Sequence, residues 1–336
     1  MREDGDSATV AQVGERALLR RILDRLSAPP PPLGPGDDAA LLTESGALVA
    51  TVDALVEGPD FRRPWSSGAD LGWKSVAVNL ADVAAMGAHP QALLLALALP
   101  PATSVAFVDD LAAGIRMALD DLAPGCVVAG GDLSASDTLA VTVTAFGRLP
   151  GLPVLRSGAR AGDVVALAGE MGLAARGLSI LRERFRTGSG EPAAVDPAIL
   201  NEDERRAVAA QLRPRPPLAA GPAAAAGGAT AMIDVSDGLA GDAIRIAEAS
   251  RVTIDLDAAA LGPDAGLALS GGEDHALLAT FPGGELPAGF RVLGTVRPRG
   301  PSPLTVDGVP HAGAAWDPYR SGSGADGSAH HTAVSP

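Results

Sequence analysis

The sequence has few of the residues on which several classes of protein depend. It contains a single cysteine, Cys126, which excludes a disulfide-stabilised scaffold and is typical of a reducing compartment. Its only lysine is Lys74, and Trp73 precedes it, so no phosphate-binding loop of the G-x-x-x-x-G-K-[ST] type can occur. Zinc patterns such as H-E-x-x-H or paired cysteines are missing as well. The phosphate-binding loop of Walker type and the common zinc-binding signatures are therefore absent.

Basic residues are also scarce. Lysine and arginine together number 26 against 40 aspartates and glutamates, which gives a net charge of −14. This balance argues against a nucleic-acid partner, because such binding depends on neutralising phosphates. No apolar region follows the N-terminal Met-Arg-Glu-Asp-Gly-Asp, and no uncharged apolar run reaches membrane-spanning length. We therefore expect a cytoplasmic protein with neither a nucleic-acid nor a membrane partner.

The length and composition predict a folded protein with two domains. The chain has 336 residues, of which 47% are hydrophobic, which is enough for two substantial cores. Glycine, proline and arginine accumulate around 147–162, which predicts a boundary there. We expect an N-terminal domain over 1–150 and a C-terminal α/β domain over 151–319. The Ser- and Gly-rich segment 320–336 is expected to be a disordered tail.

Hydrophobic periodicity predicts alternating strands and helices, and therefore an α/β (α+β) fold. The segment 187–197 is expected to be a mobile insertion. Helices are expected over 14–26, 71–87, 106–122 and 238–249, with a further helix ending near 184. Strands are expected over 39–42, 47–52, 91–99, 127–132, 139–146, 163–167, 229–235, 252–256, 275–280 and 291–296.

The helix expected over 71–87 has an unusual distribution of polar residues. Ser75, Asn79 and Asp82 fall on one narrow line at a period of 3.6 residues, and apolar residues occupy nearly all other positions. Such a helix is buried almost all round, so its carboxylate must be paired, hydrogen-bonded or bound to a metal. An aspartate bonded to backbone or arginine for structural reasons is the alternative. Ser75 and Asn79 are candidates for orienting Asp82.

Acidic residues recur in Gly- or Ser-containing turns at the ends of other apolar segments. Any one of them could be a turn former or a helix cap. Together they fit a site for several Mg²⁺ ions, because Mg²⁺ prefers oxygen ligands from carboxylates and substrate phosphates. Glycines allow backbone N–H groups to approach phosphates, which predicts Mg-nucleotide or phosphoryl-transfer chemistry. These acidic positions are Asp37-Asp38, Asp53, Asp132, Asp234 with Asp237, and Glu273-Asp274.

Longer motifs contain these acidic positions. The motifs follow one another along the chain between about residues 14 and 319. They are Gly36-Asp37-Asp38-Ala39-Ala40, Asp53-x-Leu55-Val56-Glu57-Gly58, Lys74-x-x-Ala77-Val78-Asn79-Leu80-x-Asp82-x-Ala84-Ala85-Met86-Gly87-Ala88, Gly130-Gly131-Asp132, Arg156-Ser157-Gly158-Ala159, Ile233-Asp234-x-Ser236-Asp237-Gly238-Leu239 and Ser270-Gly271-Gly272-Glu273-Asp274.

In this order the motifs resemble those of the thiamine-monophosphate kinase family. The long helical motif and the Ile-Asp-x-Ser-Asp-Gly-Leu block distinguish this family from aminoimidazole ribonucleotide synthetases and selenophosphate synthetases. The resemblance implies ATP-dependent phosphorylation of thiamine monophosphate to thiamine diphosphate. It also implies a two-domain fold like that of aminoimidazole ribonucleotide synthetase, in a homodimer whose N-terminal sheets join into a barrel.

The resemblance also implies roles for individual residues. The catalytic residues would be Asp82, Asp132 and Asp237. Residues that meet ATP would be Gly131, Asp132, Arg156 and Ser236, and those that meet the acceptor would be Asp60, Glu273 and Tyr319. The ligands of several Mg²⁺ ions would be Asp38, Thr51, Val52, Asp53, Asp82, Asp132, Asp234 and Asp237.

Some positions depart from the family pattern, and most of them lie at the acceptor end. Asp60 stands where the family usually has histidine, Val52 where threonine is common, and His275 where tyrosine is usual. The C-terminal aromatic motif is reduced to Trp316-Asp317-Pro318-Tyr319. Use of ATP and Mg²⁺ is therefore a firmer expectation than the acceptor.

The acceptor determines what the site must do. A phosphate oxygen is already largely deprotonated at neutral pH, so an in-line transfer needs no general base. Metal ions would instead neutralise and align the two polyanions. Two alternatives remain open from the residues alone: a related ATP-dependent enzyme with another acceptor, and an acidic protein that binds divalent metals without catalysis.

Overall fold

A computed structural model describes residues 8–27, 42 and 46–313 of the chain. The tail expected over 320–336 and residues 39–41 of the strand expected over 39–42 lie outside the described part, and Leu42 is not in a strand. In the first half the elements are α1 (Val10–Val13), α2 (Glu15–Leu26), β1 (Leu48–Val56), α3 (Gly68–Ala85), β2 (His89–Leu99), α4 (Val105–Leu122), β3 (Val127–Ala135) and β4 (Ala140–Arg148).

The second half contains more short elements than the sequence suggested. They are β5 (Val164–Ala168), α5 (Leu173–Arg184), η1 (Pro197–Ile199), α6 (Glu202–Leu212), α7 (Ala220–Ala226), β6 (Ala231–Val235), α8 (Leu239–Ser250), β7 (Val252–Leu256), η2 (Ala258–Leu261), α9 (Ala265–Ser270), β8 (Ala276–Phe281), β9 (Phe290–Pro298), β10 (Leu304–Val306) and β11 (Val309–Pro310).

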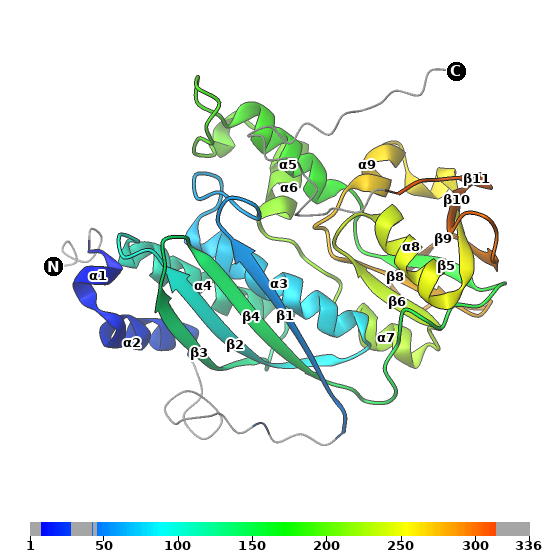
Figure 1. The fold of residues 1–336 in the computed structure, drawn as a ribbon, viewed down its shortest axis with the longest axis horizontal. Coiled ribbons are helices and arrows are strands. Elements are labelled where there is room, and N and C mark those ends of the chain that lie inside the picture. The colour runs from blue at the N-terminus through cyan, green and yellow to red at the C-terminus, as the bar shows by residue number, and fades with distance from the viewer. Residues whose placement is uncertain (1–7, 28–41, 43–45, 314–336) are drawn as a thin grey trace.

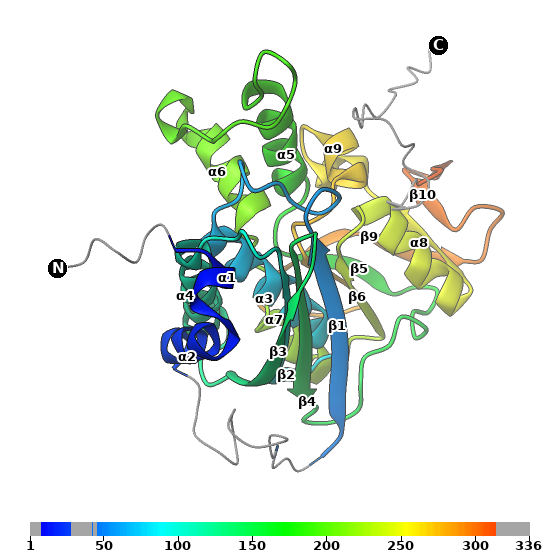
Figure 2. The same cartoon turned by 60° about the vertical axis from the view of Figure 1, so that its left-hand side comes forward.

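Strands of the first half form a four-stranded sheet in the order β1-β4-β2-β3. β4 pairs antiparallel with β1 and β2, whereas β2 and β3 run parallel. The helices lie on one side of this sheet, which Figure 2 shows nearly edge-on with α4 and α2 beside it. No helix of the described first half covers the opposite face, which is turned toward the viewer in Figure 1.

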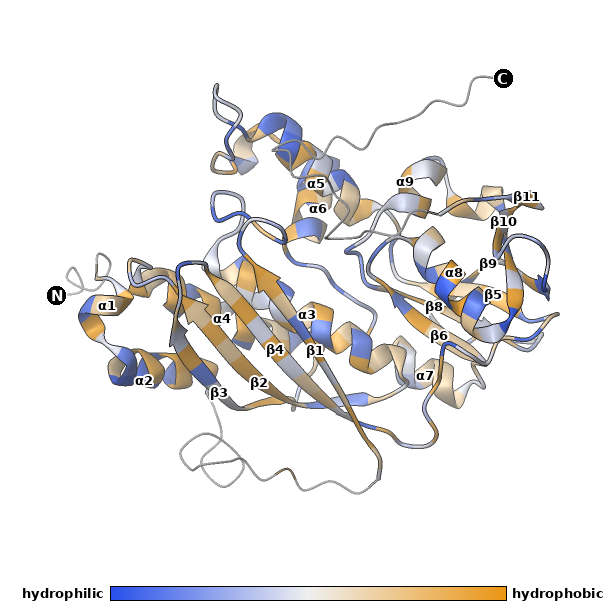
Figure 3. Cartoon of the chain, viewed as in Figure 1, coloured by the Kyte–Doolittle hydropathy of each residue, from blue (hydrophilic) through white to orange (hydrophobic). Residues whose placement is uncertain are grey.

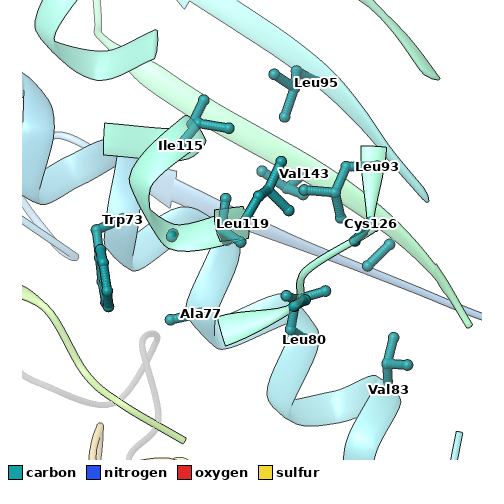
Figure 4. Packing of buried hydrophobic residues seen from close by; sticks show 14 of the residues in the cluster. Trp73, Ala77, Leu80, Val83, Leu93, Leu95, Ile115, Leu119, Cys126 and Val143 are labelled. Atoms are coloured by element: carbon teal, nitrogen blue, oxygen red, sulfur yellow. The ribbon is translucent and has the colours of Figure 1, made fainter. Parts of the chain in front are cut away.

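The core of the first half lies between this sheet and the helix pair α3 and α4. Figure 4 shows Leu80 and Val83 of α3, Leu93 of β2 and Leu119 of α4, which belong to one cluster of buried hydrophobic residues. Cys126 lies in the same cluster, and burial raises the pKa of its thiol to about 12. It is therefore a packing residue rather than a reactive thiol.

Glycines allow α3 and α4 to approach each other closely. A Cβ atom added at Gly72 would lie 2.1 Å from the carbonyl oxygen of Leu111, and one at Gly114 would lie 2.1 Å from that of Ala69. Only hydrogen fits at such distances, so the contact is between helix backbones. The remaining surface of α3 is also covered, and nearly every residue from Leu71 to Ala85 is buried, as the sequence predicts.

The second half is built on a seven-stranded mixed sheet in the order β11-β10-β7-β9-β5-β8-β6. β7, β6 and β8 are buried along their whole length, and α8 packs against β6 and β7. Apart from this sheet, α5 and α6 pack on each other at the top of Figure 1. The indole N–H of Trp65 donates to the carbonyl of Phe185 (2.9 Å), which ties α5 to the loop after β1.

Several elements differ in extent from the prediction. β1 continues through Asp53 to Val56, and β3 continues through Asp132 to Ala135, although loops were expected at both aspartates. Strand pairing holds these aspartates in regular backbone, so they are not turn formers. In the expected insertion 187–197, the amide of Thr187 donates to the carbonyl of Glu191 (2.7 Å) and closes a turn.

None of the helices in the described ranges is both long and apolar enough to cross a membrane. Figure 3 shows hydrophobic colouring concentrated along β2, β4 and the buried helices, with polar residues toward the loops.

Candidate functional site

The candidate site is organised around α3, the helix that touches both sheets. It contacts β1, β2 and β4 of the first sheet and β6 and β8 of the second, and Figure 1 shows it between the two. Asp82, near the C-terminal end of this helix, is partly buried and accepts a hydrogen bond from the hydroxyl of Thr51 on β1 (2.8 Å). Asp82 is thus held at the junction between the two halves.

Carboxylates from different elements act on one another at this junction. Burial, and then the negative charges of Asp234 and Asp53, raise the pKa of Asp82 to about 7. The pKa of Asp53 is also raised, by burial and by the charges of Asp234, Asp237 and Asp60. β1, α3 and the end of β6 therefore bring together negative charge that each strand or helix alone could not assemble.

The side-chain atoms that could bind a metal at this junction fit a hard divalent cation. These atoms are carboxylate oxygens, and a bound cation would remove the electrostatic repulsion between the carboxylates. Among the described residues, no three His, Cys, Asp or Glu side chains form a ready-made metal cage. Mg²⁺ is compatible with such an open arrangement, because it usually keeps waters and takes substrate phosphates as ligands.

Asn79 and Ser75 have a different role from the one expected. Asn79 Oδ1 accepts from the amide of Asp53 (2.9 Å), and its Nδ2 donates to the carbonyl of Ser75 (2.9 Å). The hydroxyl of Ser75 donates to the carbonyl of Gly72 within its own helix (2.9 Å). Asn79 therefore fixes β1 at Asp53, whereas Thr51 is the residue that holds Asp82.

The loop after β6 is fastened by a buried carboxylate that the sequence did not single out. Asp242 is fully buried and accepts from the amides of Ser236 (3.1 Å) and Asp237 (3.2 Å). Arg245 bridges Asp242 and Asp237, with 2.6 Å to each. Burial raises the pKa of Asp242 to about 6, despite the opposing charge of Arg245. The shape of the loop is therefore fixed by contacts within the chain itself.

Asp234 has a second partner besides the other carboxylates. His275 Nδ1 lies 3.2 Å from Asp234 Oδ2, and both side chains are buried. The hydrogen bond to Asp234 and its charge raise the pKa of His275, although burial alone would lower it. The spacing of 41 residues hides this pair from inspection of the sequence.

Two residues expected at the acceptor end lie near each other. Asp60 Oδ2 accepts from the amide of Val56 (2.8 Å), and burial and the charge of Glu273 raise the pKa of Asp60. Glu273 forms an ion pair with Lys74 of α3 (2.5 Å). The chemical role of Lys74 was missed, although a single lysine in an otherwise apolar helix was a usable signal.

Asp132 is not brought to the carboxylates of Asp53 and Asp82 within one chain. Asp132 on β3 is paired with Ala96 on β2, and Ala96 is paired in turn with Thr142 on β4. Asp53 on β1 is paired with Val143, the residue that follows Thr142 on β4. Successive residues of a strand point to opposite faces, so Asp132 lies on the uncovered face of the sheet. There it accepts a hydrogen bond from the hydroxyl of Ser134 (2.8 Å).

The remaining expected residues are spread over the two halves. A Cβ at Gly131 would lie 2.2 Å from the carbonyl oxygen of Leu95, so glycine is required there for strand packing. Val52 is 58% exposed. The backbone carbonyl of Arg156 accepts a hydrogen bond from the hydroxyl of Ser250 (2.8 Å). Asp38 and Tyr319 lie outside the described residues.

Comparison with known proteins identifies relatives across almost the whole chain. Models of the N-terminal and C-terminal domains of AIR synthase related proteins match residues 36–149 and 160–286. A thiamine-monophosphate kinase of Mycobacterium tuberculosis is 40% identical, with 94% of each chain covered.

Two solved structures extend this likeness to the fold. One is thiamine-monophosphate kinase from Stenotrophomonas maltophilia K279a, with 30% identity, a TM-score of 0.70, and 88% of this chain and 96% of that chain covered. The other is AaThiL complexed with AMPPCP and TMP, with 29% identity, a TM-score of 0.71 and coverage of 90% and 96%. The expected α/β fold of two AIR-synthase-like domains is confirmed.

Proposed function

This chain belongs to the thiamine-monophosphate kinase family, and we propose that it transfers a phosphoryl group from ATP to thiamine monophosphate, forming thiamine diphosphate. The observation that carries the proposal is the junction of Asp53, Asp82 and Asp234, where two sheets deliver repelling carboxylates around one buried helix. The similarity to AaThiL, which was solved with AMPPCP and TMP, supports the same pair of substrates here.

The proposed roles follow from where the residues lie. Asp53, Asp82 and Asp234 would hold Mg²⁺ together with Asp38, Thr51 and Asp237, and Val52 could contribute only its backbone carbonyl. Asp132 lies on the other face of the sheet, so it would hold Mg²⁺ as part of the same site only if a second copy of the chain supplied it. When bound, Mg²⁺ supplies charge neutralisation for the two polyanions. ATP would meet Gly131, Asp132, Arg156 and Ser236, and the acceptor would meet Asp60, Glu273 and Tyr319. Asp82, Asp132 and Asp237 remain the proposed catalytic residues.

The chain's own contribution to catalysis is positioning. The acceptor oxygen belongs to a phosphate that is largely ionised at neutral pH, so no side chain has to remove a proton. Thr51 fixes Asp82, Asn79 fixes the backbone at Asp53, and Asp242 with Arg245 fixes the loop of Ser236 and Asp237. These hydrogen bonds set the ligand geometry in advance, which lowers the ordering cost of an in-line transfer.

Direct product analysis tests the proposed function. We expect purified protein incubated with ATP, thiamine monophosphate and Mg²⁺ to form thiamine diphosphate and ADP in equal amounts, as measured by chromatography. Chelating the metal should abolish the product, and excess Mg²⁺ should restore it. ATP consumption with another acceptor, but no thiamine diphosphate, would instead favour a related ATP-dependent enzyme. Metal binding without any turnover would favour a metal-binding protein.

We also propose a homodimer in which the uncovered faces of the four-stranded sheets meet as a barrel. This face carries exposed apolar side chains at Val52 (58%) and Leu94 (37%), on strands whose other face is buried in the core. An apolar sheet face of this kind is costly to leave in water. A second copy of the same face would cover it symmetrically.

Light scattering tests this dimer. Leu94→Asp is expected to shift the protein toward the monomer, because a charge would be buried in the proposed interface. Leu152→Asp is the matched control, since Leu152 is 88% exposed in a loop outside the sheet and should leave the mass unchanged. A monomeric wild type, or a Leu94→Asp protein of unchanged dimeric mass, would contradict the proposed interface.

We further propose that the domain boundary lies near residue 150, between β4 and β5. The boundary is supported by the Gly- and Pro-containing connection from one sheet to the other. We also propose that the protein is cytoplasmic. A cytoplasmic location is supported by the single, buried cysteine.

A further inference from the structure

The only lysine of the chain is buried at the meeting point of three segments. Lys74 is 5% exposed, and its Nζ lies 2.5 Å from Glu273 Oε1 and 3.2 Å from the backbone carbonyl of Gln211. Lys74 belongs to α3, Gln211 to α6 and Glu273 to the loop before β8. A lysine is seldom so deeply buried unless its charge is paired, and here the partner comes from the other half of the chain.

Gln211 holds the second oxygen of the same carboxylate. Its Nε2 donates to Glu273 Oε2 (2.7 Å), so Lys74 and Gln211 between them hold both carboxylate oxygens. Gln211 is itself 5% exposed, and among the described residues its Oε1 has no hydrogen-bond donor. An unpaired buried acceptor costs free energy that a ligand N–H group could recover.

The backbone at Glu273 is held in an uncommon conformation. Glu273 and His275 have φ angles of 68° and 52°, in the left-handed region that favours glycine. The amide of Glu273 donates to the carbonyl of Ser236 (2.9 Å), and that of His275 to Val235 (3.1 Å). Backbone in such a region persists only where the surroundings over-determine it, and such positions cluster at functional sites. Here α3 and α6 supply constraints from outside the loop.

The charge state of Glu273 agrees with this geometry. Burial alone would raise its pKa, but the charge of Lys74 and the hydrogen bonds from Lys74 and Gln211 hold the pKa below its ordinary value. The carboxylate therefore stays ionised while its side chain remains 35% exposed toward solvent. An ionised, oriented and partly accessible carboxylate can bind a cationic or N–H-donating ring.

We propose that Lys74 and Gln211 are positioning residues that hold Glu273 in a single orientation for the ring system of the acceptor. The inference rests on the proposed function, since it assigns Glu273 to thiamine monophosphate rather than to ATP. A purely structural ion pair between the two halves would affect both substrates, or stability alone. A positioning role affects recognition of the acceptor while leaving the site for the nucleotide unchanged.

Steady-state kinetics of Lys74→Met separate these two roles. We expect KM for thiamine monophosphate to rise about tenfold or more, the scale of losing a hydrogen bond to a charged group, with KM for ATP within about twofold. The double variant Lys74→Met/Glu273→Gln should be no worse than Glu273→Gln, because Lys74 acts through Glu273. Equal increases in both KM values, or additive losses in the double variant, would overturn the proposal.

A milder variant and a control complete the kinetic experiment. Gln211→Leu keeps the ion pair and should also raise KM for thiamine monophosphate selectively, which covers the case of a Lys74→Met protein that does not fold. Arg206→Met removes an exposed ion pair with Glu170 and should change neither KM. A wild type that forms no thiamine diphosphate contradicts the proposed function, whereas an active wild type with a kinetically silent Lys74→Met contradicts only this inference.

The single lysine also allows a test without turnover. Protein labelled with ¹⁵N at the lysine side chain gives one ζ-nitrogen signal, which can only come from Lys74. Thiamine monophosphate should shift this signal in the wild type but not in Glu273→Gln, and AMPPCP alone should leave it in place. A signal that is indifferent to thiamine monophosphate would overturn the proposal.

Discussion

Asp82→Asn is expected to lower turnover by at least about a hundredfold with the fold intact, the scale found when one preorganised electrostatic group is lost. Asparagine is nearly isosteric with aspartate but is a poor Mg²⁺ ligand, so the loss falls on the transfer step. Measuring kcat for thiamine diphosphate formation tests this prediction, and circular dichroism verifies that the variant is folded. Unchanged kcat would show that Asp82 is structural.

The same substitution should stabilise the protein when metal is absent. Because the pKa of Asp82 rises from 3.8 to about 7 on folding, the folded state binds this proton more tightly than the unfolded chain. Its contribution to stability is present below pH 4 and is lost as the pH rises through 7. At pH 8 in a chelator we expect Asp82→Asn to melt a few degrees higher, about 2–5 °C, than the wild type.

A matched aspartate shows whether these effects belong to the site. Asp110 is exposed on α4, so Asp110→Asn should change neither kcat nor the melting temperature in chelator. Loss of activity together with a gain of stability is typical of a functional group held in an unfavourable environment. A lower melting temperature for Asp82→Asn would mean that the carboxylate has stabilising partners that outweigh its burial.

Gly72→Ala is expected to destabilise the protein by roughly 1–3 kcal/mol, the usual cost of overpacking, or more. Inside a helix this exchange normally stabilises by about 1 kcal/mol through propensity. Here the added Cβ would lie 2.1 Å from the carbonyl oxygen of Leu111, so α3 and α4 would have to separate. The steric cost exceeds the gain in propensity, and chemical denaturation should show a lower unfolding midpoint.

An open glycine provides the comparison for this prediction. A Cβ at Gly188 would meet nothing within 4 Å, so Gly188→Ala should leave the midpoint almost unchanged. Because Gly72 lies on the helix that carries Asp82, activity should fall along with stability. A neutral or stabilising Gly72→Ala would mean that α3 and α4 can move apart at no cost.

The sequence predicted the parts of the fold that depend on local periodicity. The burial of α3 followed from the line of Ser75, Asn79 and Asp82, and the main strands followed from apolar runs. The helix α7 was missed because its five alanines, one glycine and one proline carry no amphipathic pattern. β3 was ended too early because Gly131 and Asp132 suggest a turn, whereas pairing with β2 overrides that local preference.

The site was predictable in composition but not in partners. The recurring acidic residues at the ends of apolar segments pointed to Asp53 and Asp234, the polar line of the expected helix pointed to Asp82, and the resemblance implied their roles. The contacts of Asp82 with Thr51, of Asp234 with His275 and of Glu273 with Lys74 join positions 31, 41 and 199 residues apart. No periodicity or motif encodes such long-range contacts, because they depend on how the two sheets pack around α3. Asp242 was missed because its function is to hold backbone rather than to bind a ligand.

The position of α3 also has a consequence for synthesis of the chain. The helix is complete once residue 85 has been made, but its contacts with Pro214 and Glu273 join positions 141 and 199 residues apart. At translation rates of about 5–20 residues per second, apolar surface of α3 stays uncovered for roughly 10–40 s. The nascent chain therefore passes through an aggregation-prone stage, during which a chaperone that covers α3 should increase the yield of native protein.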